Sequence, residues 1–155
     1  MKQGMVLLLC LLGLPALAGD AKVYLLATLG LTGSTVTRSI VLEEPDIGDL
    51  QACGEAVRQG QRDGDWLKYH HIMRRDKMKG FSAQVQYRCV TSTQAIETWF
   101  DKDRYDYSYL VAVDEQSRMT LRLMESMAVC MGEYRALPAA EQAVSHCAKG
   151  NQRVR

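Results

Sequence analysis

The chain has 155 residues, of which 47% are hydrophobic, and its 19 basic residues nearly balance its 18 acidic residues. This length suits one domain with a hydrophobic core, and no proline-, glycine- or serine-rich linker and no internal repeat divides it. The balanced charge gives no long-range attraction to polyanions, so the composition argues against nucleic acid as a partner and against an anionic membrane surface.

The first residues have the three-part layout of an export signal. Lys2 supplies a positive start, residues 6–14 (VLLLCLLGL) supply an apolar core that Pro15 ends, and residues 16–18 (ALA) form a small-x-small cleavage site. We expect cleavage after Ala18, which divides the chain into a signal peptide at residues 1–18 and a single mature α+β domain at residues 19–155. The expected location is therefore periplasmic or secreted.

A permanent membrane anchor is the competing interpretation of this segment. The uncharged run at residues 3–19 is at the short limit for crossing a hydrocarbon layer of about 30 Å, and Pro15 interrupts it. A second apolar stretch at residues 23–31 leaves a later cleavage site open, although a buried strand explains this stretch more simply. We expect no stable membrane anchor after cleavage.

Two strands and a helix are predicted in the first part of the mature chain. Residues 22–29 are mostly apolar and are expected to form the first strand, and a glycine-containing turn separates them from residues 35–43, which are rich in β-branched side chains. Asp46 or Asp49 caps a helix over residues 49–61, whose apolar side chains recur at helical spacing.

The middle of the chain predicts a short helix, a strand and a second helix. Aromatic and apolar residues within residues 65–75 are spaced at three and four, which favours a helix. Strict alternation over residues 81–89 predicts the clearest strand, with Gln84, Gln86 and Arg88 on its polar face. Ser92 or Thr93 is then expected to cap a helix that continues to residue 100.

The last part predicts a β-hairpin followed by two helices. Residues 107–113 and 119–123 alternate and are joined by a short polar turn. Helices are expected over residues 125–136 and 138–148, and residues 151–155 are expected to fray. Interspersed strands and helices indicate an α+β fold, a small single domain with a mixed or antiparallel sheet and helices packed on one face.

Four cysteines remain once Cys10 leaves with the signal: Cys53, Cys89, Cys130 and Cys147. An even number in an exported chain indicates two disulfide bonds, for which three pairings are possible. We expect Cys53–Cys89, because a helix packed across a strand would join them, and Cys130–Cys147, because a helical hairpin would. The chain has no C-x-x-C motif and no zinc-like spacing, so we expect neither a redox pair nor a metal site.

The histidines do not form a recognisable catalytic or metal-binding pattern. His70 and His71 are adjacent, so their side chains diverge on a helix and point to opposite faces on a strand. His146 is expected to be an exposed helix residue beside a disulfide. No G-x-S-x-G or S-x-x-K motif and no dinucleotide or phosphate-binding glycine pattern is present, so we expect no catalytic residue and no cofactor.

Two segments are candidate surfaces for binding a protein partner. The first is a basic cluster formed by Arg74, Arg75, Lys77 and Lys79. An acidic surface could dock there, while a solvated loop is the simpler explanation.

The second candidate surface combines aromatic and acidic side chains, namely Trp99, Asp101, Asp103 and Tyr105. Tyrosine and tryptophan are favoured at interfaces. The aspartates do not match a calcium-binding EF-hand loop, which needs Gly at its sixth position and Glu at its twelfth. A looser oxygen-ligand site stays open.

These features favour an exported, non-catalytic protein-binding domain of the bacterial envelope, such as an inhibitor or immunity protein against a periplasmic toxin or enzyme. The general profile is similar to that of small exported immunity proteins, and no shared motif carries the resemblance further. The alternatives are a cell-envelope hydrolase that uses dispersed carboxylates or a histidine, and an accessory subunit of an envelope complex.

Overall fold

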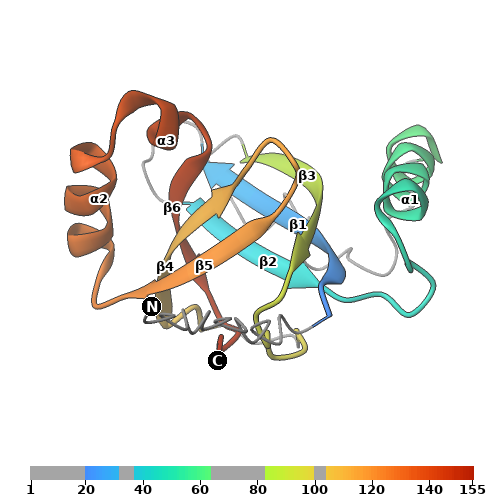
Figure 1. Cartoon of the computed structure of the whole chain (residues 1–155), viewed down its shortest axis with the longest axis horizontal. Coiled ribbons are helices and arrows are strands. Elements are labelled where there is room, and N and C mark those ends of the chain that lie inside the picture. Colours follow the sequence, from blue (N-terminus) through green and yellow to red (C-terminus); the bar gives the residue numbers. More distant parts are fainter. Residues whose placement is uncertain (1–19, 32–36, 64–82, 100–103) are drawn as a thin grey trace, which may run out of the picture.

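Six strands form one curled sheet with helices on its outer side (Figure 1). The computed structural model describes residues 20–31, 37–63, 83–99 and 104–155. The elements in chain order are β1 (Lys22–Leu31), β2 (Thr37–Leu42), α1 (Leu50–Asp63), β3 (Ala83–Ser92), β4 (Tyr107–Val113), β5 (Met119–Met124), α2 (Met127–Ala136), α3 (Ala139–Ala143) and β6 (Ser145–Gly150). The predicted signal peptide, residues 1–18, lies outside the described residues.

The strand order is β3-β1-β2-β6-β4-β5, and the sheet is mixed. β2 and β6 run parallel, with Arg38 opposite Lys149, whereas the other neighbouring pairs are antiparallel. β6 therefore joins two antiparallel units, β3-β1-β2 and β4-β5, into one sheet. The α+β fold and the single small domain expected from the sequence are confirmed.

The two edge strands of the sheet meet at one end. Thr91 of β3 forms a β-bridge with Arg118, and its backbone N–H donates to the Ser117 carbonyl at 2.8 Å. The side-chain amide of Gln94 then accepts a hydrogen bond from the Leu121 N–H at 2.6 Å and donates one to the Leu121 carbonyl at 2.9 Å. The sheet is therefore closed into a partial barrel at this end.

The inner face of the curled sheet holds the largest core cluster, to which β1 and β2 as well as β4 and β5 contribute. Its buried members are Tyr24, Leu26, Val41, Val90, Tyr109, Val111, Val113, Met119, Leu121 and Ala148. Side chains alternate between the two faces of a strand. On each strand, the residues that alternate with these cluster members therefore point outward. The barrel interior is therefore a hydrophobic core at its closed end.

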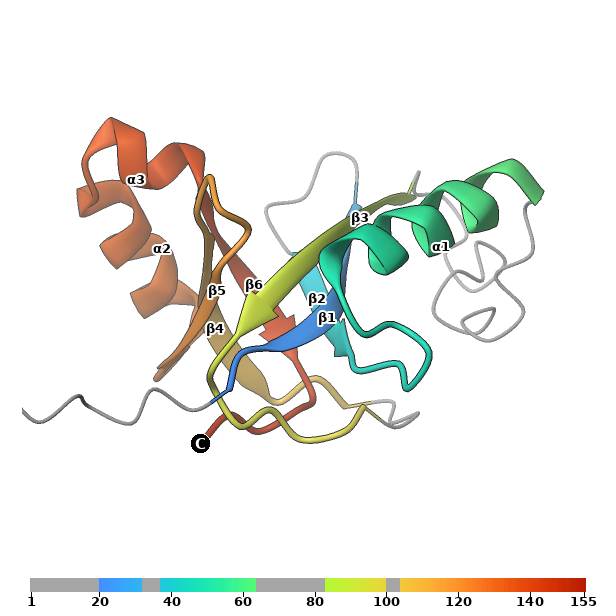
Figure 2. The same ribbon diagram turned by 45° about the vertical axis from the view of Figure 1, so that its right-hand side comes forward.

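Both long helices pack on the outer face of the sheet, at its two ends (Figure 2). Cys53 of α1 is bonded to Cys89 of β3, and Cys130 of α2 is bonded to Cys147 of β6, each with 5.9 Å between the Cα atoms. Both predicted pairings are confirmed, as is the packing of helices on one face. The second disulfide joins a helix to a strand, however, where a helical hairpin was expected.

The helix predicted over residues 138–148 is wrong. α3 ends at Ala143, and Ser145–Gly150 form β6 in the middle of the sheet. Tyr107–Ala112 pair with this segment along its whole length, so long-range strand pairing overrides the local helical spacing. The Cys147 side chain consequently points outward to α2, and its neighbour His146 points inward.

The helix predicted after Ser92 or Thr93 is also wrong, and so is the frayed tail. The N–H of Glu97 donates to the Arg153 carbonyl at 2.9 Å, and the N–H of Arg155 donates to the Ala95 carbonyl at 3.0 Å. The chain after β3 is thus extended and paired with the C-terminal residues. This pairing satisfies the backbone groups that a helix would otherwise have satisfied internally.

Gln152 explains why the C-terminal residues are ordered. Its side-chain amide accepts from the Val41 N–H at 2.8 Å and donates to the Val41 carbonyl at 2.7 Å, and it also donates to the Glu97 carbonyl. The Tyr109 hydroxyl donates to the Gln152 carbonyl at 2.7 Å. The Gln152 side-chain amide therefore satisfies both backbone groups of Val41, as a neighbouring strand would.

The helix predicted over residues 49–61 is confirmed, and Asp49 rather than Asp46 begins it. The Asp49 carboxylate accepts a hydrogen bond from the Ala52 N–H at 2.7 Å, which is the usual capping contact at a helix N-terminus. The short helix predicted within residues 65–75 lies outside the described residues.

Candidate functional site

A polar pocket of about 360 Å³ lies on the inner face of the curled sheet and extends from Arg88 and Val113 toward Gln84 and Gly30. Its polar lining residues are Thr28, Thr37, Gln84, Gln86, Arg88 and His146. Leu26, Gly30, Val113 and Ala143 complete the lining. The pocket is therefore the polar continuation of the inner face whose other end is the hydrophobic core.

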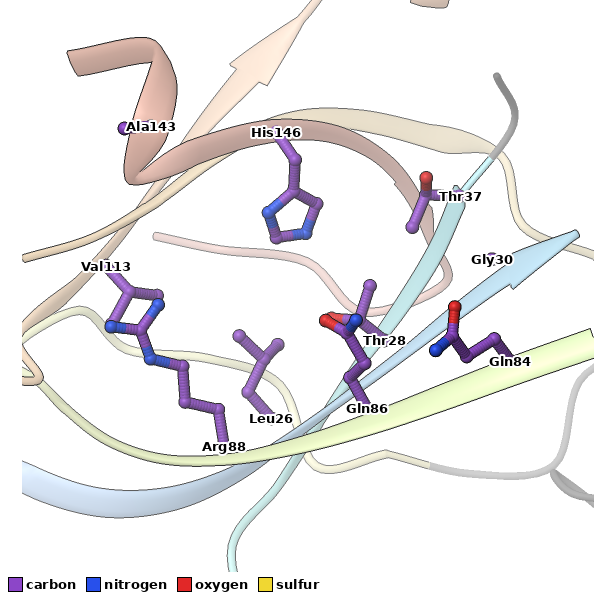
Figure 3. Close-up of a pocket in the computed structure, with 10 residues that line it drawn as sticks. All are labelled: Leu26, Thr28, Gly30, Thr37, Gln84, Gln86, Arg88, Val113, Ala143 and His146. Carbon is purple, nitrogen blue, oxygen red and sulfur yellow. The ribbon is translucent and has the colours of Figure 1, made fainter. Parts of the chain in front are cut away.

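Strand alternation places three polar side chains of β3 in this pocket. Gln84, Gln86 and Arg88 are two residues apart, so they share one face, and Figure 3 shows them rising from β3 toward His146 on β6. The intervening Tyr87 and Cys89 pack outward against the cluster beside α1. The polar face of β3 is thus the inner face at this end of the sheet.

Three side chains from three strands form a hydrogen-bonded chain beside the pocket. The Thr28 hydroxyl of β1 lies 3.3 Å from the Ser39 hydroxyl of β2. The Ser39 hydroxyl in turn lies 3.2 Å from Nε2 of His146 on β6. Ser39 is buried, so this chain fixes the orientation of the imidazole ring from inside the sheet.

His146 is held in its neutral form at neutral pH. Burial lowers the pKa of its imidazole from the ordinary value of 6.5, and the positive charge of Arg88 lowers this pKa further. Both effects disfavour the imidazolium ion, because burial removes hydration from a charge and a nearby like charge repels it. His146 therefore offers one N–H donor and one nitrogen acceptor.

The side chains that line the pocket offer hydrogen-bond donors and one permanent positive charge, that of Arg88. None of the described residues that line the pocket is an aspartate, glutamate or cysteine. Within the described part of the chain, no group of three or more histidine, cysteine or acidic side chains could hold a metal ion. The four cysteines that the structure describes are all in disulfides, so none of these four has a thiolate for nucleophilic chemistry.

A second hollow, of about 530 Å³, lies beside the first residues of β1 and the segment after β2. Its Lys22 ammonium donates to the Glu43 carboxylate at 2.8 Å, and this contact raises the pKa of Lys22. The two charges are already paired with each other and lie at the exposed rim. The first pocket is therefore the stronger candidate site.

Most of the partner-binding residues expected from the sequence cannot be placed. The basic cluster of Arg74, Arg75, Lys77 and Lys79 lies outside the described residues, and so do Asp101 and Asp103 and the histidine pair at residues 70–71. Their position relative to the pocket is therefore outside what the structure describes.

Trp99 and Tyr105 are among the described residues. Both are half-buried and pack against the same outer cluster, which includes Leu25 and Ile40. The Arg38 guanidinium lies 4.8 Å from the centre of the Tyr105 ring. These aromatics belong to the outer face of the sheet, whereas the pocket belongs to the inner face.

The sequence predicted some of the residues that line the pocket, but not the pocket itself. The alternation within β3 correctly placed Gln84, Gln86 and Arg88 on one face, but a polar strand face is ordinarily expected to face solvent. The prediction that His146 is an exposed helix residue is wrong, because His146 lies on β6 with its side chain inward beside Ser39. The sequence pattern does not show that His146 lies on a strand, because the strands that pair with β6 are distant in the sequence.

In the described part of the chain, none of the helices has the length and apolar character required to cross a membrane. No protein-family model, no curated protein and no solved structure matches this chain.

Proposed function

We propose that this chain is an exported, non-catalytic protein-binding domain of the bacterial envelope, acting as an inhibitor or immunity protein against a periplasmic toxin or enzyme. The observation that carries the proposal is the donor-rich pocket on the inner face of the curled sheet. Its described lining offers binding groups without the pair of acidic groups or the free thiol that envelope hydrolases use.

The disulfides support an oxidising compartment for this function. Two bridges tie both long helices to the sheet, and disulfides persist mainly in exported proteins. The layout of residues 1–18 supports export independently. A small, cross-linked domain keeps a preformed surface, which lowers the entropic cost of binding a partner.

A cell-envelope hydrolase is the second candidate, and the contact between Ser39 and His146 favours it. A serine hydroxyl 3.2 Å from a neutral imidazole nitrogen has the geometry of a nucleophile beside a general base. However, only 7% of Ser39 is exposed, and its hydroxyl also contacts Thr28. No described acidic side chain lines the pocket to orient His146, so the contact serves binding better than catalysis.

The test combines capture of a partner with a search for catalysis. The disulfide-bonded protein, tagged at its C-terminus, is used to capture partners from an envelope extract of the native host, with an unrelated exported protein of similar size as control. The captured protein is then purified separately and titrated by calorimetry. We expect a stoichiometric complex of micromolar or tighter affinity.

Catalysis is tested on the same preparation with a fluorophosphonate, which labels activated serines. We expect no labelling of Ser39 in the wild-type protein, with Ser39→Ala as the reference. Labelling of Ser39, or the absence of any stoichiometric protein complex, would contradict the proposed function.

A further inference from the structure

We propose that the pocket on the inner face is a carboxylate-binding site, in which the Arg88 guanidinium and the side-chain amides of Gln84 and Gln86 hold a single carboxylate group. This inference names the chemical group and does not depend on whether a protein carries that group. It can therefore fail while the proposed function stands, and the reverse also holds.

The first argument is the charge of the lining. Arg88 is the permanently charged side chain among the described lining residues, and no described carboxylate faces it there. A guanidinium attracts an anion and holds a carboxylate by two parallel N–H···O bonds. One positive charge matches one carboxylate, whereas a phosphate carries more charge than this lining compensates.

The second argument is that the donors are available. Within the described part of the chain, the one hydrogen bond of the Arg88 guanidinium is a long contact of 3.5 Å to the Asp114 carbonyl. The backbones of Gln84 and Gln86 pair with β1, but their side-chain amides form no hydrogen bond with described residues, and both side chains are exposed and line the pocket. These three side chains can therefore turn their N–H groups to a ligand without breaking an internal contact.

The third argument is the shape and origin of the pocket. Its volume of about 360 Å³ is at the small end of the range of about 300–1,000 Å³ for ligand pockets. The floor is formed by Thr28 and by Leu26, which belongs to the hydrophobic core. Such a pocket admits a small acid or one acidic side chain, with its carboxylate toward Arg88.

His146 couples this site to pH. Arg88 is the charged group that acts on its imidazole. The ring contacts the uncharged hydroxyl of Ser39, which in turn contacts the uncharged hydroxyl of Thr28. A bound carboxylate opposes the repulsion from Arg88 and so favours the imidazolium ion. Binding therefore takes up a proton, and carboxylates bind more tightly as the pH falls.

The test is an NMR titration of the ¹⁵N-labelled, disulfide-bonded protein at constant ionic strength. The probes are acetate, N-acetylglutamate amide with its side-chain carboxylate, N-acetylalanine with its terminal carboxylate, and inorganic phosphate. We expect saturable shifts for Gln84, Gln86, Arg88 and His146 with the carboxylates. Whichever amino-acid probe binds more tightly identifies a side chain or a chain terminus as the source.

Arg88→Gln removes the charge, and Arg58→Gln is the matched control on α1, where the guanidinium is exposed and bonded to Glu55 at 2.6 Å. We expect Arg88→Gln to weaken carboxylate binding by about tenfold or more, Arg88→Lys to weaken it by less, and Arg58→Gln to leave it unchanged. The amide spectrum of each variant reports whether it is folded.

A second readout follows the His146 ring proton with pH, with and without saturating acetate. We expect acetate to raise the pKa of His146, and Arg88→Gln to raise it in the free protein. Three results would overturn the inference: no saturable shifts at the pocket, carboxylate binding that Arg88→Gln leaves unchanged, or tighter binding of phosphate than of every carboxylate.

Discussion

His146 is a residue whose surroundings couple protonation to stability. Burial and the positive charge of Arg88 lower the pKa of its imidazole in the folded protein below the ordinary value of 6.5. The unfolded chain therefore binds more protons than the folded chain between these two pKa values. The free energy of unfolding must decrease as the pH falls through this interval.

We expect this decrease in urea unfolding measured from neutral pH down to about pH 5. His146→Gln keeps a polar side chain beside Ser39 but does not titrate, so its free energy of unfolding should fall less steeply over the same interval. Parallel curves for the two proteins would show that His146 titrates in the folded state as it does in the unfolded chain.

At the scale of the elements, the β4–β5 hairpin depends on one residue in an unusual conformation. Ser117 has a φ of 62°, the left-handed region in which a β-carbon is costly. The turn is closed by the Asp114 carboxylate, which accepts from the N–H groups of Gln116 and Arg118 at 2.9 and 2.8 Å. These bonds lower the pKa of Asp114.

Ser117→Val should destabilise the protein, because a β-branched side chain is tolerated least in this left-handed region, where any β-carbon already costs about 1–2 kcal/mol. Ser117→Gly is the matched control, since glycine adopts a positive φ freely, and it should leave stability nearly unchanged. Thermal unfolding of the three proteins measures both effects. Equal effects of the two substitutions on thermal stability would show that the positive φ of Ser117 does not determine the stability of the hairpin.

Helix α1 is attached to the sheet mainly through its disulfide. Among its described side chains, Cys53 is fully buried, and most of the others are exposed or half-buried. The double variant Cys53→Ser/Cys89→Ser opens a loop with a sequence separation of 36 residues. On the chain-entropy account this costs about 4 kcal/mol of stability.

We expect a local consequence in hydrogen exchange, with faster exchange of the α1 amides and retained protection in β4 and β6, which α1 does not touch. The Cys130→Ser/Cys147→Ser variant is the comparison. Uniform loss of protection in the first variant would show that α1 is part of the cooperative core.

Local patterns predicted the elements whose partners are close in sequence. β1 and β2, the helix that Asp49 caps and the hairpin after Tyr107 all follow from alternation, capping and turn chemistry. β6 could not be predicted, because only its two neighbours in the sheet make it a strand. The extended segment after Ser92 has the same explanation, since the C-terminal residues supply its partners.

The candidate site was predictable only in fragments for the same reason. Gln84, Gln86 and Arg88 share a face by alternation alone, but a single strand does not reveal whether its polar face meets solvent or a pocket. Curling of the sheet decides this, and it depends on Thr91 meeting Arg118. His146 joins them only because β6 lies between β2 and β4.

At the scale of the whole molecule, the inner face of the curled sheet changes from apolar to polar along its strands. β3 passes from buried Val90 to exposed Gln84 along one face, and β6 passes from buried Ala148 to half-buried His146. The hydrophobic end stabilises the fold, so the polar end can vary its side chains at little cost to stability.

The disulfide between Cys130 and Cys147 acts on the whole sheet, because β6 joins its two units. The double variant Cys130→Ser/Cys147→Ser opens a loop with a sequence separation of 17 residues, which costs about 3 kcal/mol. We expect hydrogen exchange to quicken in β2 and β4 together, in contrast to the local effect at α1. Protection lost in α2 alone would contradict this expectation.

The position of β6 also sets when the protein can fold. Residues 145–150 are the latest of the described strands in the chain, yet they lie between strands that are made much earlier. A growing chain can form separate hairpins, but it cannot assemble the sheet until nearly all of it has been synthesised. Late folding of this kind suits the export proposed above, because a chain that has not yet folded can be threaded through a narrow translocation channel.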